Sequence, residues 1–196
     1  MSQLRDLTED YTNSSPNARD PEVLLLFSVM LKHAGDLMAD FLPTIMQSLC
    51  QSTLQMIQQD TTTYPEFRDG FFRLVMNIIK HCANGLFQQS GESFQTVVYT
   101  VIFAMQHEKP DLMELGNESM HSLCMTLAES PSFATIFYQN FFTTCMKEII
   151  TVLTDYRHMA GFKMQGQIVQ LMLQAIDSET TVDPSVRLND LSGNPH

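Results

Sequence analysis

Apolar residues recur along this chain at intervals of three and four, the spacing of one face of an α-helix. The stripes extend from about residue 21 to residue 176, and glycines, prolines and polar turns separate them. The spacing predicts an all-α chain. We expect helices at about 21–34, 38–59, 65–82, 92–107, 110–128, 132–154 and 162–176, with the end of a further helix at 1–12.

Single residues refine these limits. Asp20 is typical of a helix N-cap, and Gly35 is expected to end the first helix. Pro43 is expected to separate a short opening turn from the 38–59 helix. Gly85 and Gly91 are expected to flank a short loop. The stripes also assign Leu26, Ile136 and Ile150, and four methionines, to the core: Met30, Met46, Met105 and Met172.

A short motif heads three of the predicted helices. Pro21, Pro65 and Pro110 are each followed by an acidic and then an apolar residue, and they stand 44 and 45 residues apart. Proline suits the first helical position, and the acid suits the positive end of the helix dipole. The regular spacing of the motif indicates an internal repeat.

A period near 45 residues with two helices in each unit is typical of HEAT and armadillo proteins. The sequence therefore predicts an α-α superhelix of about three and a half helical hairpins, each burying its apolar face against its neighbours. The expected organisation is a helix remnant and loop at 1–19, hairpins at 20–63, 64–109 and 110–156, the first helix of another hairpin at 157–177 and a polar tail at 178–196.

The net charge restricts the kinds of partner that the chain can bind. The chain holds 11 Lys and Arg against 22 Asp and Glu, a net charge of −11. Binding to nucleic acid needs clustered basic residues, so we expect no direct contact with it. The first eleven residues are polar and charged, unlike a signal peptide, and the uncharged run 41–59 is interrupted by glutamines and serines. The sequence predicts a soluble protein that crosses no membrane.

The residues offer little catalytic chemistry. No phosphate-binding loop, nucleophile elbow or zinc-protease motif occurs, so we expect neither an enzyme nor a cofactor. His33, His81 and His107 are expected in the last turns of helices, where positive charge is favoured anyway. His121 and Cys124 share a helix face, but two ligands are too few for a metal site. The four cysteines are expected to be reduced and buried: Cys50, Cys82, Cys124 and Cys145.

Two groups of polar residues are candidates for contact with a partner. The first is a row of glutamines at helical spacing on the 38–59 helix, and the second is a charged pair on the 132–154 helix. Both fit either a solvated helix face or the concave contact surface of a repeat array. The candidate residues are Gln47, Gln51, Gln55, Gln58, Lys147 and Glu148.

Several segments resemble a known family, in order and with its spacing. They are 20–23 (DPEV), 64–74 (YPEFRDGFFRL), 132–133 with 137–139, 152–155 (VLTD), 158–161 (HMAG) and 193–195. Nearly the whole chain is similar to the C-terminal part of the exportin-1 family, the nuclear export receptors for leucine-rich signals within the importin-β/karyopherin superfamily.

The resemblance implies a scaffold of the C-terminal arch, within a parent about five times longer. The parent would bind Ran in its GTP form together with export-signal cargo and would shuttle between nucleus and cytoplasm. Nucleoporins are further candidate partners. The resemblance places the cargo groove and its reactive cysteine in earlier repeats, so neither is expected here, and the segment is expected to be monomeric.

Two other classes compete with this interpretation. One is a HEAT-repeat scaffold subunit of a different complex. The other is a helical enzyme with a site in the bundle core, which would need converging polar groups where the sequence places apolar stripes.

Overall fold

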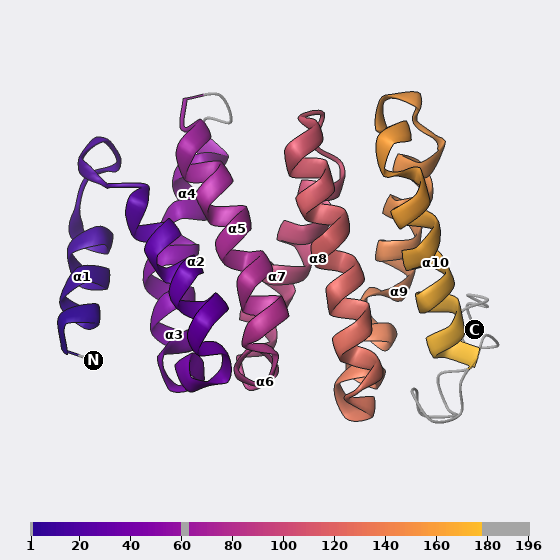
Figure 1. Cartoon of the computed structure of the whole chain (residues 1–196), viewed down its shortest axis with the longest axis horizontal. Coiled ribbons are helices and arrows are strands. Elements are labelled where there is room, and N and C mark those ends of the chain that lie inside the picture. Colours follow the sequence, from indigo (N-terminus) through magenta and orange to yellow (C-terminus); the bar gives the residue numbers. More distant parts are fainter. Residues whose placement is uncertain (1, 60–62, 178–196) are drawn as a thin grey trace, which may run out of the picture. The chain divides into compact units, whose positions relative to one another are not determined.

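The computed structural model describes residues 2–59 and 63–177, and its regular elements are all helical (Figure 1). No strand occurs in these two ranges. The chain divides into two compact units, Met1–Thr100 and Val101–His196. Paired helices build both units, so the predicted all-α fold of HEAT-type hairpins is confirmed. The predicted polar tail at 178–196 lies outside the described residues.

The first unit is built from long helices and short helical segments. In chain order its elements are α1 (Ser2–Asn13), η1 (Pro16–Ala18), α2 (Glu22–Ala34), η2 (Gly35–Phe41), α3 (Leu42–Thr44), η3 (Ile45–Cys50), α4 (Gln51–Gln59), α5 (Pro65–His81), α6 (Ala83–Phe87) and α7 (Gly91–Met105), the last of which continues into the second unit.

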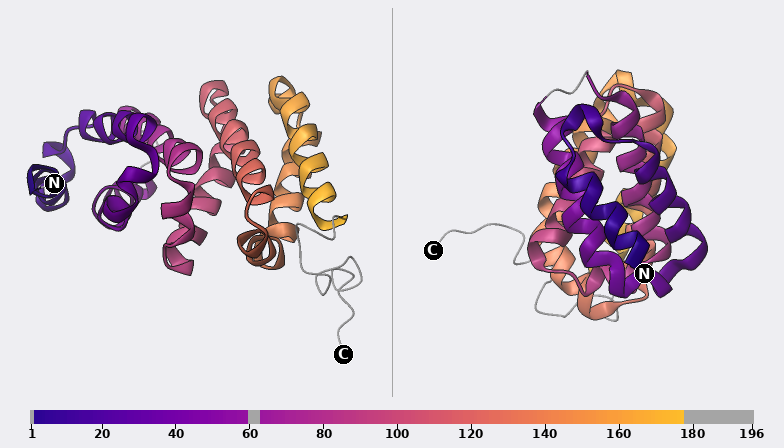
Figure 2. Two further views of the ribbon diagram at one scale, coloured as in Figure 1. Left: turned by 60° about the horizontal axis from the view of Figure 1, so that its bottom comes forward. Right: turned by 90° about the vertical axis from the view of Figure 1, so that its left-hand side faces the viewer.

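The largest helix contact of the first unit joins α2 to α5, which lie side by side in Figures 1 and 2. Leu24, Phe27 and Leu31 of α2 are fully buried. Gly70 of α5 lies so near that a Cβ built on it would come within 3.2 Å of the Leu24 Cβ atom. The two first helices of successive hairpins therefore pack directly on each other, as a helical repeat requires.

The repeated Pro-acid motif stands at helix starts, as predicted. α5 begins at Pro65 and α8 at Pro110. α2 begins at Glu22, one residue after the expected start, and Pro21 is its N-cap residue. The Asp20 carboxylate accepts a hydrogen bond from the Glu22 backbone N–H at 3.0 Å, so Asp20 satisfies a free donor as a cap does.

The prediction over 38–59 is confirmed in part: a 3-10 turn precedes Pro43 as expected and helical residues run from Leu42 to Gln59, but the helix is not regular throughout. The chain leaves α2 at Gly35, whose φ of 54° is the left-handed conformation that favours glycine, and enters the 3-10 segment η2. Pro43 then falls in the first turn of the short α3, where a backbone N–H has no intrahelical partner and proline is well tolerated. A π-helical segment, η3, follows before regular α geometry resumes in α4. Hydrogen-bond spacing thus changes three times within one predicted helix.

The predicted loop between Gly85 and Gly91 is partly wrong, because 83–87 form the short helix α6. Cys82 has non-helical dihedral angles and separates α6 from α5. A Cβ on Gly85 would lie 2.9 Å from the Cys82 sulfur and 3.0 Å from Ala39. Gly85 therefore permits close packing of α6 on η2 and does not mark a turn.

The second unit holds the end of α7, α8 (Pro110–Ala128), α9 (Pro131–Thr154), η4 (Tyr156–Gly161) and α10 (Phe162–Asp177). The long helices match the predicted ones to within two residues, whereas η4 was not expected. α10 packs against both α8 and α9. Gly116 makes a further close approach possible, since a Cβ there would lie 2.4 Å from the Met105 backbone nitrogen.

Polar contacts hold η4 in place. Asp155 accepts a 3.0 Å hydrogen bond from the Arg157 backbone N–H and further ones from the Arg157 guanidinium, which also pairs with Glu108. These bonds hold the pKa of Asp155 at about 2. His158 is buried, and its Nε2 atom lies 3.2 Å from the carbonyl oxygen of Gln106. These contacts tie η4 to the segment that joins α7 to α8.

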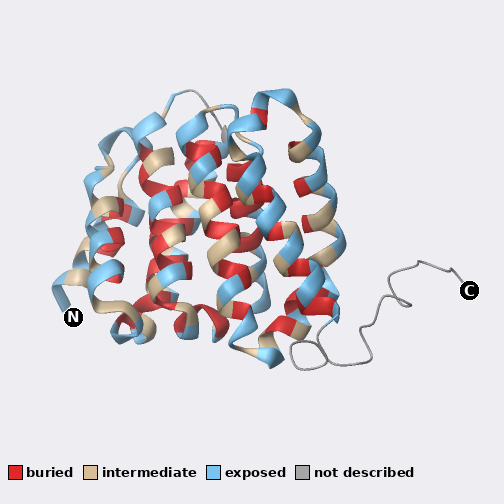
Figure 3. Cartoon of the chain, turned by 45° about the vertical axis from the view of Figure 1, so that its right-hand side comes forward, coloured by how far each residue is buried: buried red, intermediate tan, exposed pale blue. Residues whose placement is uncertain are grey.

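Most predicted core residues are buried, and Figure 3 shows how buried and exposed faces alternate around the helices. Met46, Met105 and Met172 are buried, while Met30 is half-buried. The exceptions are Leu26, Ile136 and Ile150, which are 45 %, 52 % and 50 % exposed. Their assignment to the core was wrong because each lies at the edge of its stripe, where it faces away from the packed neighbours.

Candidate partner-contact groove

The predicted glutamine row is exposed. Gln47 lies on η3, and Gln51, Gln55 and Gln58 lie on α4. The residues on the opposite side of these two elements are buried: Ile45, Leu49, Thr53, Met56 and Ile57. The row is thus the outer face of an amphipathic helix, as the spacing predicts.

Contacts on the buried side fix the direction of this face. The Thr53 hydroxyl pairs with the Tyr11 hydroxyl at 2.7 Å, in the contact with α1. Arg19 donates to the carbonyl oxygens of Tyr11 and Ser52 at 3.0 and 3.1 Å, and its guanidinium stacks on the Tyr11 ring. Since one cation bridges both elements, α4 is held against α1 and the glutamines are directed away from it.

A second polar wall stands opposite the glutamines. It consists of residues 88–90, which follow α6, and residues 91–96, the first turns of α7. Gln89 donates from Nε2 to the Gly85 carbonyl oxygen at 2.8 Å. Ser90 accepts from the Ser93 backbone N–H at 3.3 Å, which caps α7. The Thr96 hydroxyl bonds back to the Glu92 carbonyl oxygen. These local bonds order the wall in the absence of any partner.

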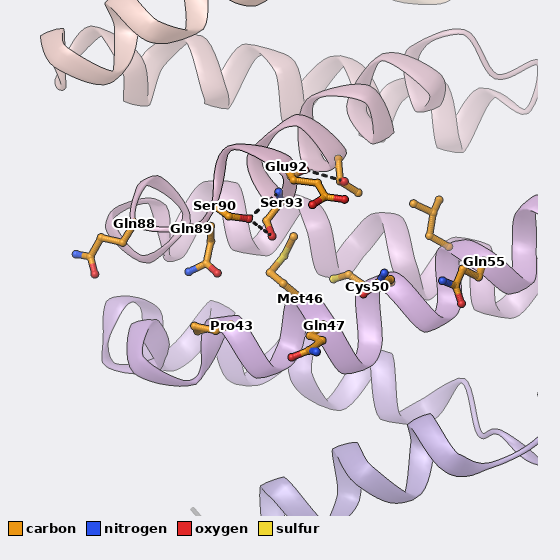
Figure 4. A pocket seen from close by; sticks show the side chains of 13 residues that line it. Pro43, Met46, Gln47, Cys50, Gln55, Gln88, Gln89, Ser90, Glu92 and Ser93 are labelled. Atoms are coloured by element: carbon orange, nitrogen blue, oxygen red, sulfur yellow. Dashed lines mark hydrogen bonds between the residues drawn. The ribbon is translucent and has the colours of Figure 1, made fainter.

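A groove of about 660 Å³ lies between the two walls (Figure 4). Gln47, Gln51 and Gln55 line one side of it, whereas Gln58 lies outside. Met46 projects between the walls in Figure 4. The remaining lining residues are Pro43, Cys50 and Leu54 from the glutamine side and Gln88, Gln89, Ser90, Glu92, Ser93 and Thr96 from the opposite side.

The groove is suited to hydrogen bonding with a polar ligand. Each glutamine amide offers both donors and an acceptor. Glu92 is the single charged residue among the described lining residues. Cys50 contributes no nucleophile, because burial raises the pKa of its thiol to about 12. The lining therefore favours binding and offers no activated group for covalent chemistry.

The charged pair on α9 lies in the other unit. Lys147 is exposed, and Glu148 is half-buried and accepts a hydrogen bond from the Gln106 side-chain amide. The structure therefore does not bring this pair into the groove, and one of its two charges already has an intramolecular partner.

Sequence reasoning missed the wall at 88–96. Its signal was the run of uncharged polar residues from Gln88 to Ser90. This run lies more than thirty positions from Gln55, and only folding places it opposite the first row.

The other titratable candidates form no site in the described ranges. His107 lies past the end of α7, and its Nδ1 atom accepts from the Lys109 backbone N–H at 2.9 Å, so its placement in a last helical turn was wrong. The Cys124 thiol is buried, and burial raises its pKa to about 12. Across 2–59 and 63–177, no three metal-ligating side chains gather.

None of the helices within the described ranges is long and apolar enough to cross a membrane.

Comparison with known proteins gives a consistent result. A family model described as "CRM1 C terminal" matches residues 2–194. The chain is 33% identical over 187 residues to Protein EXPORTIN 1B of Arabidopsis thaliana, covering 95% of this chain and 17% of the relative. It is 30% identical over 176 residues to Exportin-1 of Schizosaccharomyces pombe, covering 89% and 16%. It is 25% identical over 175 residues to Exportin-1 of Dictyostelium discoideum, covering 89% and 17%. The chain thus spans about a sixth of the length of these relatives.

Proposed function

The chain belongs to the CRM1 C-terminal family, and from this we propose that it is a scaffold segment of a nuclear export receptor. The observation that carries the proposal is the family match over residues 2–194, which leaves almost no part of the chain outside it. The relatives named exportin support the same class of protein.

In this proposal the segment belongs to the arch that faces Ran, and hairpins 20–63, 64–109 and 110–156 are its repeating units. The complete receptor would bind Ran in its GTP form together with cargo that carries a leucine-rich export signal. It would release both after hydrolysis and so shuttle between nucleus and cytoplasm. The segment itself would act by stacking and flexing, which couples the two binding events.

The proposal is tested with the complete parent protein. Purified receptor is mixed with Ran loaded with GTP or with GDP, in the presence of an export-signal peptide, and the bound Ran is recovered. We expect recovery with GTP-loaded Ran alone. Equal recovery of the two forms would exclude the export-receptor function and favour a HEAT scaffold of another complex.

A binding experiment with the 196-residue chain tests its assignment to the C-terminal arch. Because the resemblance places the cargo groove in earlier repeats, this chain should not bind a fluorescent leucine-rich export peptide. Fluorescence polarisation measures this directly, and micromolar binding would contradict the placement.

A further inference from the structure

We propose that the groove between η3–α4 and residues 88–96 binds an extended polypeptide segment of a protein partner through its backbone. The amides of Gln47, Gln51 and Gln55 are the groups that pair with the peptide bonds. The inference rests on the proposed function in one respect, because an export receptor must hold other proteins. It adds the site and the chemical form of the bound segment.

The spacing of the amides fits an extended chain. Gln51 and Gln55 are four residues apart in the regular helix α4, which is about 6 Å along its axis. Gln47 precedes Gln51 by another four residues, across the π-helical η3. An extended peptide presents backbone groups to the same side at every second residue, about 6.7 Å apart. The mismatch for the Gln51–Gln55 pair is about 0.7 Å, within the reach of a flexible glutamine side chain.

The amides are also free to act. In the described part of the chain, no side-chain hydrogen bond is formed by Gln47, Gln51 or Gln55, and all three are exposed. A peptide group carries one donor and one acceptor, and a glutamine amide can satisfy both at once. Uncharged amides therefore suit the backbone of a partner better than they suit a phosphate or a carboxylate, which needs positive charge.

Apolar side chains at the groove base complete the fit. Met46 lies between the two walls and Pro43 lies at one end (Figure 4), and Leu54 also lines the groove. Alternate side chains of an extended segment point toward the base, where a flexible methionine accepts varied shapes. Glu92 on the opposite wall favours a basic residue over an acidic one in the bound segment.

The backbone of the groove wall gives an independent reason to expect a function there. η3 is π-helical over Ile45–Cys50, and the Gln51 N–H donates to the Met46 carbonyl oxygen, five residues back. π-helical turns are rare and occur frequently at functional sites. Three residues of this segment, Met46, Gln47 and Cys50, line the groove.

The test uses the 196-residue chain labelled with nitrogen-15 and a capped probe peptide, acetyl-Lys-Thr-Val-Thr-Val-Thr-Val-Thr-amide. NMR follows the side-chain amide signals of the glutamines during titration. We expect the signals of Gln47, Gln51 and Gln55 to shift with a Kd of about 1 mM or lower, whereas that of Gln58 stays unchanged.

Two further probes separate backbone from side-chain recognition. In each, esters replace the amides along one edge of the extended peptide, which removes the N–H donors of that edge and keeps every side chain. Binding should be lost with one of the two and kept with the other. Equal binding of both ester peptides and the parent would overturn the inference, as would the absence of any shift at about 5 mM peptide.

Matched variants localise the effect. Gln51→Leu keeps a side chain of similar size but removes the amide, and it should weaken binding about tenfold. Gln58→Leu makes the same change on the same helix outside the groove and should leave the Kd unchanged. Equal weakening by both would also contradict the assignment. If the peptide does not bind while the parent recovers GTP-loaded Ran, only this inference fails and the export function stands.

Discussion

The Asn77 side-chain amide donates a 2.6 Å hydrogen bond to the Ser28 hydroxyl across the buried contact of α5 with α2. The two residues are 49 positions apart and form a polar link inside an interface that is otherwise apolar. A buried amide without such a partner would lose its hydrogen bonds to water and gain nothing in exchange.

This link should contribute measurably to stability. Asn77→Ala leaves the Ser28 hydroxyl buried without its donor, and we expect a loss of about 1–3 kcal/mol in the free energy of unfolding, measured by urea denaturation. Ser28→Ala combined with Asn77→Ala should cost less than the sum of the single changes.

Asn84→Ala is the matched control, because the Asn84 amide also bonds a side chain in a preceding element, Asp36, at 2.7 Å. That bond is exposed, so its loss should cost less than about 1 kcal/mol. A larger loss at Asn84 than at Asn77 would argue against burial as the cause.

Replacement of two glycines of the second unit by alanine should change the stability of the protein in opposite directions. A Cβ at Gly116 would lie 2.4 Å from a backbone nitrogen, and backbone cannot rotate away as a side chain can. Gly116→Ala should therefore lower the melting temperature, with a loss of about 3 kcal/mol or more. Gly166 of α10 has no atom within 4 Å of its built Cβ, so Gly166→Ala should stabilise the protein by about 0.5–1 kcal/mol.

Calorimetry of both variants gives the melting temperatures that check these two predictions. A melting temperature that rises or stays constant for Gly116→Ala would contradict the close contact of α8 with the end of α7. A fall for Gly166→Ala would contradict the open space at α10.

The cysteines should make stability fall as the solution becomes alkaline. Burial raises the pKa of Cys50 and Cys124 to about 12 and that of Cys82 to about 11. In the unfolded chain a thiol ionises near its ordinary pKa of about 8.5. The folded state therefore keeps a proton that the unfolded state releases, and its stability is complete below pH 8.5 and declines above it, by about 2 kcal/mol for each fully buried thiol at pH 10.

Denaturation of the wild type and Cys50→Ala across pH 8–10.5 checks this. The variant has a lower stability at neutral pH but should have a shallower slope, and equal slopes would contradict the prediction. The folded protein should also resist alkylation by iodoacetamide at pH 8, since the thiolate is the reactive form.

The site was only half predictable from the sequence. Spacing alone identified Gln47, Gln51, Gln55 and Gln58 as one exposed face, because a helical period can be counted along the chain. That three of the four line a groove and Gln58 does not depends on the wall at 88–96, which α6 and η2 position through Gly85. No periodicity along the sequence encodes a distance between two separate segments.

What the sequence determined by itself is the class of fold and the positions of the long helices. Repeated Pro-acid starts and 3–4 stripes specify α5, α8, α9 and α10, because caps and amphipathic faces are local interactions. The tertiary structure decided the rest. It broke the 38–59 segment into η2, α3, η3 and α4, and it turned Leu26, Ile136 and Ile150 toward solvent. Burial and hydrogen-bond register depend on which neighbours pack on each face, and the neighbours are distant in the chain.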